Sequence, residues 1–305
     1  MDSLLNFVRE CCLRNGILKK LSVLLFLVLF CASVGKVWYC CLDGFSTRRI
    51  HFDFSEAGAV SFLEPDLQPI FSKKYSYLGR GRQCYAFVSD DDRYVLKLPR
   101  SDCYRIPFWL RSCSFAFLNP RKEVSLASHK KRCQFLLNSF SLAHSELKKE
   151  TGLLYVHLSP TDYLKTYVSI YDRLGRLHRL DLDKTAFVFQ EKKPLMIPLF
   201  KQRLNEGDRE GAKVILEAFM DLIATRAKKG IFGKDGSFLR NFGYDGDRVI
   251  QVDIGDFYRP AVEDFSFALS FERATVHLVE WLGEIDSDMQ SWFKMRMSEI
   301  IKEAS

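Results

Sequence analysis

An uncharged apolar run near the N-terminus constrains this chain more than any other feature, because so apolar a segment must be removed from water. Positions 21–35 carry no charged residue and lie between Lys20 and Lys36. A helix that spans a bilayer needs roughly 20 residues. Apolar residues on both sides extend the run to 17–42, provided that the two lysines reach the lipid headgroups with their long side chains. We therefore expect a membrane anchor at 17–42, preceded by an N-terminal tail at 1–16.

A signal peptide is the alternative interpretation of this segment. Basic residues precede the apolar run, and the small residues Cys31, Ala32 and Ser33 lie near its end, as at a cleavage site. The basic residues are slightly more numerous on the N-terminal side, which favours an N-terminus in the cytoplasm. The nine cysteines show neither zinc-ligand spacing nor a regular disulfide pattern, and this favours a reducing compartment.

The rest of the chain has the composition of a globular protein. Of the 305 residues, 47% are apolar and 27% are charged, which is enough to bury one or two cores. The net charge of +7 comes from basic residues that are scattered among acidic ones rather than grouped in a patch. We interpret this balance as solubility together with an anionic ligand, and we expect no nucleic-acid partner.

The folded domain is expected to begin near Tyr75 with three short strands. Residues 43–74 contain Pro65 and Pro69 and show no long period, so we expect them to form a linker. The polar residues at 89–92 predict a turn. Runs of β-branched and aromatic residues predict strands at 76–78, 85–88 and 93–98. Three strands in succession predict a small antiparallel sheet.

Two glycines and a lysine on this sheet are candidate phosphate-binding residues. Gly79 and Gly81 fall at the first bend, where backbone N–H groups can approach phosphate oxygens because no side chain intervenes. Lys97 points to the same face of its strand as Val95, so its ammonium group would project from an apolar surface below that bend. Ordinary hairpin glycines and an edge-strand lysine in solvent are the alternative interpretation.

A helix and a second group of strands complete this first unit, which we expect at 75–193. Asn119 followed by Pro120 predicts the start of a helix that continues to Glu150. The charged residues at 191–194 predict a connector to a mainly helical second unit at 194–305. Between them, further strands are expected at 153–158, 167–171, 176–182 and 186–190.

The second unit contains the clearest helix and three polar candidates. Residues 208–229 have apolar residues at three- and four-residue spacing, with Asp208 as a cap. Asp235 lies in the loop that follows, Asn241 begins a hairpin, and Asp253 ends it. One carboxylate could orient a hydroxyl group, while the amide and the other carboxylate could hold Mg²⁺. Considered one at a time, the three are an ordinary turn, a strand cap and a loop carboxylate.

Considered together and in this order, these residues resemble the protein-kinase-like superfamily in a divergent form. The resemblance covers about positions 75–258. It implies a two-lobed α+β fold with a small antiparallel sheet, a long helix and a truncated, mainly helical second lobe. It also implies ATP and Mg²⁺ as cofactors, with a nucleotide as partner. The resemblance rests on Gly79, Gly81, Val95-Leu96-Lys97, the helix at 208–229, Gly230-Ile231, Lys234-Asp235, Asn241 and Asp253-Ile254-Gly255.

The resemblance also implies a role for each site residue. A glutamate on the 119–150 helix would hold the phosphate-binding lysine, and Glu123, Glu146 and Glu150 are candidates. Glu146 is preferred because it lies shortly before the next expected strand. The remaining roles are Gly79 and Gly81 at the phosphates, Lys97 on the α- and β-phosphates, Asp235 as the catalytic residue that orients the acceptor hydroxyl, and Asn241 and Asp253 on Mg²⁺.

The sequence departs from the family at several positions. Cys84 stands where the third glycine of the phosphate loop would be, and Gly233 stands where the loop histidine would pack. The spacing from Asp235 to Asn241 is one residue longer than in the family. No Ala-Pro-Glu-like element follows Asp253. We therefore expect a small-molecule, lipid or sugar acceptor rather than a protein, and the acceptor itself stays unknown.

Three functions remain open at this point. The favoured one is a membrane-anchored phosphotransferase that uses Mg·ATP, with a single-pass anchor and its main domain in the cytoplasm, where ATP is. The second is a catalytically inactive pseudokinase that serves as a binding scaffold. The third is a structural membrane protein with an unrelated α+β domain, in which Lys97 would lie far from Asp253.

Overall fold

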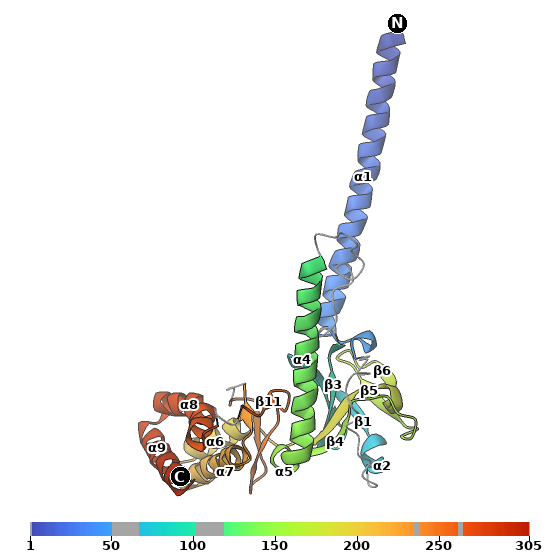
Figure 1. Cartoon of the computed structure of the whole chain (residues 1–305). Helices are drawn as coiled ribbons and strands as arrows, with labels where there is room; N and C mark the ends of the chain where they lie inside the picture. The colour runs from blue at the N-terminus through green and yellow to red at the C-terminus, as the bar shows by residue number, and fades with distance from the viewer. Residues whose placement is uncertain (1, 51–66, 102–118, 235–237, 262–264, 305) are drawn as a thin grey trace.

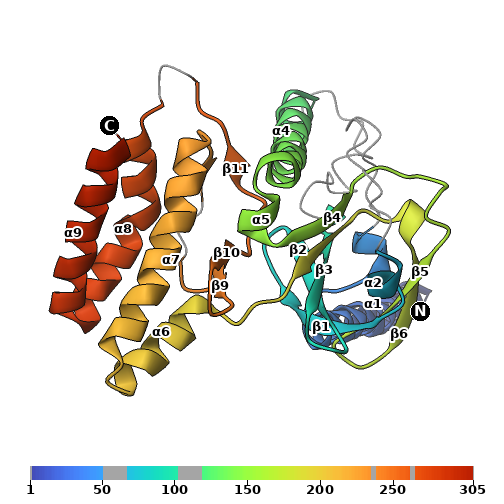
Figure 2. The same cartoon turned by 90° about the horizontal axis from the view of Figure 1, so that it is seen from below.

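The computed structural model describes residues 2–50, 67–101, 119–234, 238–261 and 265–304, and only the backbone of 2–18, 119–122 and 126. The fold is α+β, with two lobes and an N-terminal helix that projects away from them (Figure 1). We call the part that follows this helix, up to residue 193, the sheet lobe, and the part from residue 194 onward the helical lobe. Figure 2 shows the two lobes side by side.

The projecting helix is α1 (Asp2–Cys41). Its segment Lys19–Cys41 is long and apolar enough to cross a membrane, and no part of it is buried inside the protein. The segment expected at 17–42 is therefore a helix whose length and composition would suit a membrane span. A helix that is apolar on all sides needs an apolar environment, and the thickness of a bilayer fits this one.

The sheet lobe is built around one seven-stranded sheet in the order β4-β7-β3-β2-β1-β5-β6. All neighbouring strands are antiparallel except β1 and β5, which are parallel. The three strands expected from the sequence thus form the centre of a larger sheet. The strands are β1 (Lys74–Arg80), β2 (Cys84–Ser89), β3 (Tyr94–Pro99), β4 (Leu153–His157), β5 (Tyr167–Tyr171), β6 (Leu177–Asp181) and β7 (Phe187–Glu191). The helical elements are η1 (Thr47–Arg49), α2 (Gln68–Phe71), α4 (Asn119–Glu146), α5 (Lys148–Thr151) and η4 (Leu182–Lys184).

The described part of segment 43–74 belongs to the core of the sheet lobe. Phe45, Ile50 and Phe71 are buried in the same apolar cluster as Tyr85 of β2. The Tyr85 hydroxyl also donates a hydrogen bond to the carbonyl of Gly44 at 2.6 Å. The expected linker is therefore packed structure where it is described. Its described aromatic residues, Phe45 and Phe71, come from a turn and a short helix rather than from one long element, so they follow no period.

Helix α4 packs against β4 of the sheet lobe and β11 of the helical lobe (Figure 2). Its Leu136 and Phe140 are buried in one cluster with Val188 of β7 and with Ile254 and Phe257 of the helical lobe. The helix thus joins the sheet to the segment around residue 254. This contact brings two parts of the chain together that lie far apart in the sequence.

The helical lobe holds four helices and two small strand pairs among its described residues. Asp208 caps α7 as expected, since its Oδ1 accepts a hydrogen bond from the Gly211 N–H at 2.9 Å. Strands β9 and β10 form the expected hairpin, while β8 and β11, which precede and follow that hairpin in the chain, pair with each other. The elements are α6 (Met196–Asn205), α7 (Arg209–Lys228), β8 (Phe232–Gly233), β9 (Phe242–Tyr244), β10 (Val249–Gln251), β11 (Phe257–Tyr258), α8 (Phe267–Ile285) and α9 (Ser287–Ala304).

Candidate functional site

A cavity of about 300 Å³ lies where the β1–β2 turn, β3, α4 and the end of the β9–β10 hairpin meet. Four residues predicted from separate parts of the sequence line it: Gly81, Lys97, Asn241 and Asp253. Gly79 is not among its lining residues and lies on β1 with open space around its Cα. Asp235, the predicted catalytic carboxylate, lies outside the described residues.

Lys97 is partly buried on β3 and points toward the helical lobe. Its Nζ donates a hydrogen bond to the carbonyl of Val252, the residue before Asp253. Burial lowers the pKa of Lys97 below its ordinary value, while the nearby Asp253 carboxylate and Cys84 oppose this shift. An anionic ligand in the cavity would favour the charged form of the lysine further.

The predicted pairing of Glu146 with Lys97 is not what the structure contains. Glu146 lies at the end of α4 and forms an ion pair with Arg259, with 2.9 Å between Oε1 and Nη2. Glu150 pairs with Lys229 at 2.7 Å, and Glu123 is exposed. The prediction was wrong because it chose a glutamate by its place before a strand, whereas the phase of α4 turns Leu136 and Phe140 toward the sheet.

Ser139 is the polar residue on the inner face of α4 that contacts the site segment. Its buried hydroxyl donates to the carbonyl of Ile254 at 2.6 Å and accepts from the N–H of Phe257 at 2.7 Å. The Gly255 N–H in turn donates to the Asp253 carboxylate at 3.2 Å. These three hydrogen bonds fix the backbone after Asp253 and orient its side chain.

Asn241 and Asp253 lie at the open end of the β9–β10 hairpin. The Val252 N–H donates to the Asn241 carbonyl at 2.7 Å, so the two residues flank the same hydrogen bond. An amide oxygen and a carboxylate suit Mg²⁺, which keeps several waters and phosphate oxygens as ligands. Within the described ranges there is no group of three or more His, Cys, Asp or Glu side chains that could hold a metal without such help.

The cavity is lined by more positive than negative charge. Arg82, Lys97 and Arg240 face it, and Asp253 is the acidic residue among its lining residues. Sequence reasoning missed both arginines. The available signals were their positions, since Arg82 lies between Gly81 and Cys84 and Arg240 precedes Asn241. This charge balance suits a polyanionic ligand.

The β1–β2 turn is closed by its own hydrogen bonds. The Gly81 N–H donates to the Cys84 carbonyl at 2.9 Å, and the Arg100 N–H donates to the Gln83 carbonyl at 2.7 Å. Gln83 also reaches across the cavity, where its Nε2 donates to the Gly255 carbonyl at 3.0 Å. The Gly81 amide is thus engaged within the turn, so side chains rather than this N–H would bind phosphate.

A buried arginine explains the glycine at position 233. Arg226 of α7 donates to Gln251 Oε1 at 2.6 Å, and burial lowers its pKa to about 10 although Asp256 opposes the shift. A Cβ at Gly233 would lie 3.3 Å from Arg226 Nη1 and 3.5 Å from Asp256 Oδ2. Asp256 therefore belongs to this buried cluster and does not line the cavity that contains Asp253.

The connector between the lobes packs against the β9–β10 hairpin. The Tyr244 N–H donates to the Pro194 carbonyl at 2.8 Å, and Lys193 forms ion pairs with Glu191 at 3.1 Å and Asp245 at 3.2 Å. These contacts hold the two lobes together at the predicted connector.

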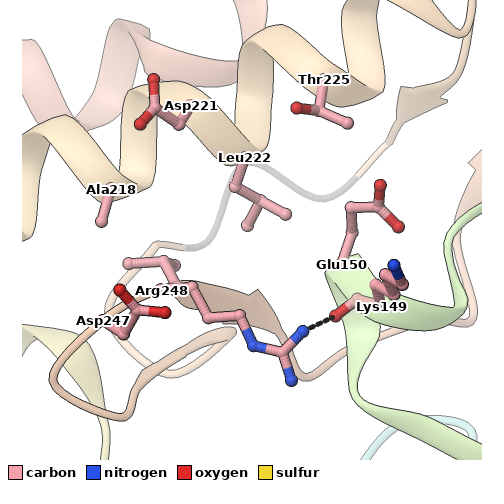
Figure 3. Close-up of a pocket in the computed structure, with 9 residues that line it drawn as sticks. Lys149, Glu150, Ala218, Asp221, Leu222, Thr225, Asp247 and Arg248 are labelled. Atoms are coloured by element: carbon pink, nitrogen blue, oxygen red, sulfur yellow. Dashed lines mark hydrogen bonds between the residues drawn. The ribbon is translucent and has the colours of Figure 1, made fainter.

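A second, smaller cavity of about 190 Å³ lies between α5, α7 and the β9–β10 turn. In Figure 3, Arg248 donates to the Lys149 carbonyl at 3.2 Å, with Asp221 and Thr225 of α7 on the opposite wall. Glu150, one of the three glutamates considered as the partner of Lys97, is among its lining residues, whereas Gly81, Lys97, Asn241 and Asp253 are not. Its lining includes three acidic and two basic side chains, so its walls offer no excess of positive charge to an anionic ligand.

Two comparisons with known proteins point to no family, so the functional conclusion rests on the geometry of the site. No protein-family model matches the chain. No curated protein is significantly similar to it.

Proposed function

We propose that this chain is a membrane-anchored, kinase-like phosphotransferase that uses Mg·ATP and acts on an acceptor still to be identified. One observation carries the proposal: Gly81, Lys97, Asn241 and Asp253 were predicted from separate segments and line one cavity. The net positive charge of that cavity agrees with a nucleotide triphosphate as ligand. In an unrelated fold, Lys97 and Asp253 would not be expected to line the same cavity.

The order of elements also supports this proposal. A mainly antiparallel sheet is followed by a connector, helix α6, the long helix α7, a loop, and a hairpin that leads to the aspartate, in the order expected from the family that the sequence resembles. The pairing of β8 with β11 brackets the loop that contains Asp235. Along the chain, β8 and β11 therefore flank both this loop and the β9–β10 hairpin.

Each residue would have a defined part in phosphoryl transfer. Lys97 would bind the α- and β-phosphates, and Asn241 and Asp253 would hold Mg²⁺, which neutralises charge on the phosphates when bound. Asp235 would accept a hydrogen bond from the acceptor hydroxyl and orient it. Arg240 adds a further positive charge at the same wall of the cavity.

The anchor agrees with a single-pass arrangement in which both lobes lie on the cytoplasmic side. The segment Lys19–Cys41 supports the membrane assignment by length and composition. ATP is cytoplasmic, and the bias of basic residues toward the N-terminal side is slight. Placing the lobes in the cytoplasm therefore follows from the proposed chemistry rather than from the charges around α1.

A pseudokinase is the second candidate, and two contacts favour it. Lys97 has a backbone carbonyl as partner where an active kinase has a glutamate. Gln83 crosses the cavity to the Gly255 carbonyl and narrows the space above Asp253. A protein with these features could bind a nucleotide without transferring its phosphate.

Thermal unfolding of the full chain in detergent micelles, with and without Mg·ATP, tests the proposal. Nucleotide at 100 times its Kd should add about 2.7 kcal/mol to the free energy of unfolding and raise the Tm by several degrees. Lys97→Ala and Asp253→Asn should lose this rise. The exposed residues Lys74 and Asp162 provide the controls Lys74→Ala and Asp162→Asn, which should keep it.

The outcomes separate the candidates. Folded parent protein whose Tm does not respond to Mg·ATP would refute the nucleotide site. A rise in Tm that depends on Lys97 and Asp253, without hydrolysis or transfer of the γ-phosphate, would establish the pseudokinase. A rise together with phosphate release or transfer would establish the enzyme.

A further inference from the structure

The cavity of the proposed nucleotide site lies at the end of the sheet lobe that is attached to α1. Arg80, the last residue of β1, donates to the Tyr39 hydroxyl at 2.9 Å and forms an ion pair with Asp43 at 3.5 Å. Tyr77 of the same strand donates to the Asp43 carboxylate at 2.7 Å. Gly81, which follows Arg80, already lines the cavity. Because consecutive Cα atoms are about 3.8 Å apart, the cavity begins directly beyond this attachment.

The strand pairing places the cavity and the connector at opposite ends of the sheet. Strand β1 runs toward α1 and ends at Arg80. Cys84, which begins β2 after the turn, pairs with Pro99 at the end of β3. Tyr94, at the start of β3, pairs instead with Glu191 beside the connector. The six residues of β3 cover about 17 Å, and this length separates the connector from the end of the sheet that meets α1.

The β9–β10 hairpin of the helical lobe has the same orientation. Its turn lies at the connector, where Asp245 forms an ion pair with Lys193 at 3.2 Å. Its open end carries Asn241 and Asp253, and both residues line the cavity. Together with Lys97, the proposed phosphate and metal ligands therefore lie toward α1 and away from the connector.

The candidate span sets the distance of this end from a bilayer. The span ends at Cys41, two residues after Tyr39, and tyrosine rings favour the membrane–water interface. The headgroup layer extends about 5–8 Å beyond the hydrocarbon region on each side. Figure 1 shows α1 projecting from this end of the sheet lobe. Since Arg80 contacts Tyr39 and Gly81 lines the cavity, the cavity lies next to the headgroup layer.

Three exposed leucines lie near the same end of the sheet lobe. Leu174 is in the β5–β6 turn, and Arg173 of this turn donates to the Cys40 carbonyl at 3.5 Å. Leu78 and Leu177 lie on β1 and β6. Each of the three leucine side chains is about half exposed. Apolar side chains beside the end of a membrane span can be buried at the lipid surface, where they hold a domain against it.

We propose that the acceptor of the phosphotransferase is a hydroxyl group of a membrane lipid in the leaflet next to the sheet lobe. This inference rests on the proposed function and names the class of its acceptor. A lipid hydroxyl is confined to the layer beside the cavity, so it meets the nucleotide at a high effective concentration. A soluble acceptor would instead have to enter between the lobes and the bilayer.

The transfer moves one phosphoryl group from ATP to the lipid. The hydroxyl oxygen forms a bond to the γ-phosphorus, and the bond from that phosphorus to the β–γ bridging oxygen breaks. ADP leaves with the electron pair of the broken bond, and the hydroxyl proton passes to solvent. The product is a lipid phosphomonoester, which extraction with an organic solvent separates from a soluble product.

The test uses the full chain in phosphatidylcholine nanodiscs that contain phosphatidylinositol, phosphatidylglycerol and diacylglycerol, with inositol and glycerol in the buffer. Mg·ATP labelled at the γ-phosphate is added, and the label is then counted in the lipid extract and in the soluble fraction. We expect the label in the lipid extract.

A leucine variant tests whether the sheet lobe meets the lipid surface. Leu177→Glu should raise the KM for the lipid, measured as its fraction in the nanodisc, roughly tenfold. The rise in Tm with Mg·ATP should stay. Leu269→Glu is the matched control, because Leu269 is exposed on α8, on the side of the molecule away from α1 (Figures 1 and 2). Leu174→Glu replaces Leu177→Glu if the latter does not fold.

Each outcome decides the inference. Label in the lipid extract, with a KM for the lipid that rises in Leu177→Glu and not in Leu269→Glu, supports it. Label on inositol or glycerol alone would overturn the lipid acceptor and leave the phosphotransferase in place. A rise in Tm with Mg·ATP but no transferred label would overturn the inference in favour of the pseudokinase. An equal KM in both leucine variants would overturn the contact with the lipid surface. A Tm that does not respond to Mg·ATP would refute the nucleotide site itself.

Discussion

Replacing Ser139 by alanine should loosen the segment that carries Asp253. The fully buried hydroxyl donates to the Ile254 carbonyl at 2.6 Å and accepts from the Phe257 N–H at 2.7 Å. Both backbone groups would lose this partner while remaining away from water, since Ile254 and Phe257 are each 1% exposed. A buried polar group without a partner costs about 1–3 kcal/mol. We therefore expect Ser139→Ala to cost about 2–4 kcal/mol, concentrated in residues 253–257.

Amide hydrogen exchange of the full chain in detergent micelles measures this effect where it arises. The Phe257 amide is the group bound by Ser139, and a loss of about 2 kcal/mol corresponds to roughly 30-fold faster exchange. Ser145→Ala is the matched control on the same helix. Ser145 is exposed, and its hydroxyl donates to the Leu142 carbonyl at 3.4 Å, so this change should leave exchange at Phe257 as it was.

Two results would refute the reasoning. Unchanged exchange at Phe257 in Ser139→Ala would show that water or a neighbouring group satisfies the two backbone atoms. Equal acceleration at every protected amide would show that Ser139 stabilises the whole fold rather than this segment. Acceleration confined to 253–257, together with a weaker Mg·ATP response, would place Ser139 among the residues that position Asp253.

Three further changes test other parts of the structure. Burial alone would raise the pKa of Asp183, but hydrogen bonds from Thr161 and two backbone amides hold it below its ordinary value. The ionised Asp183 carboxylate therefore contributes its full stabilisation above about pH 4 and loses it as the pH falls further. Asp183→Asn should lower the free energy of unfolding by about 1–3 kcal/mol at neutral pH. In urea unfolding, the free energy of unfolding of this variant should also depend less on pH in the acid range. In Gly243→Ala the new methyl would lie 2.8 Å from Lys193 Cβ, and the displaced connector should cost about 1–3 kcal/mol in the same assay. Arg226→Ala should cost about 3–5 kcal/mol, because it leaves Asp256 without its buried cation.

Matched controls accompany these three variants. Asp162→Asn changes an exposed carboxylate in the same loop region and should leave the acid profile unaltered. Gly79→Ala adds a methyl group that meets nothing within 4 Å, so its unfolding midpoint should stay near that of the parent. Arg179→Gln removes an exposed arginine. A variant no less stable than its control would contradict the contact from which its cost was derived.

Local signals in the sequence predicted the elements that depend on local chemistry. The Asp208 cap, the apolar spacing of α7 and the hairpin after Asn241 are all present, because capping, helical periodicity and turn residues act over a few positions. Among the four site residues that share a cavity, Gly81, Asn241 and Asp253 lie just beyond the ends of strands, whereas Lys97 lies within β3 and was predicted from the alternation of its strand. The role of Asp235 at the site stays a prediction, because this residue lies outside the described part of the chain.

Features that depend on long-range packing could not be predicted. The parallel pairing of β1 with β5 joins residues far apart in the chain and leaves no periodic signal in either strand. The burial of Phe45 and Phe71 likewise depends on the sheet that they cover. Glu146 was the wrong partner for Lys97 because the phase of α4 is set by packing against β4 and β11, which the helix sequence does not encode by itself.

Ser139, and not a glutamate, connects α4 to the site segment, and this decides which residues a movement of α4 would displace. In a kinase-like site the helix glutamate holds the lysine, so movement of the helix moves a phosphate ligand. Here Lys97 is held by the Val252 carbonyl, and α4 is held to the backbone of Ile254 and Phe257 instead. A shift of α4 would therefore displace the Asp253 segment first and reach Lys97 only through Val252. Asp253, the proposed metal ligand, rather than Lys97 is therefore the residue expected to respond first to the position of this helix.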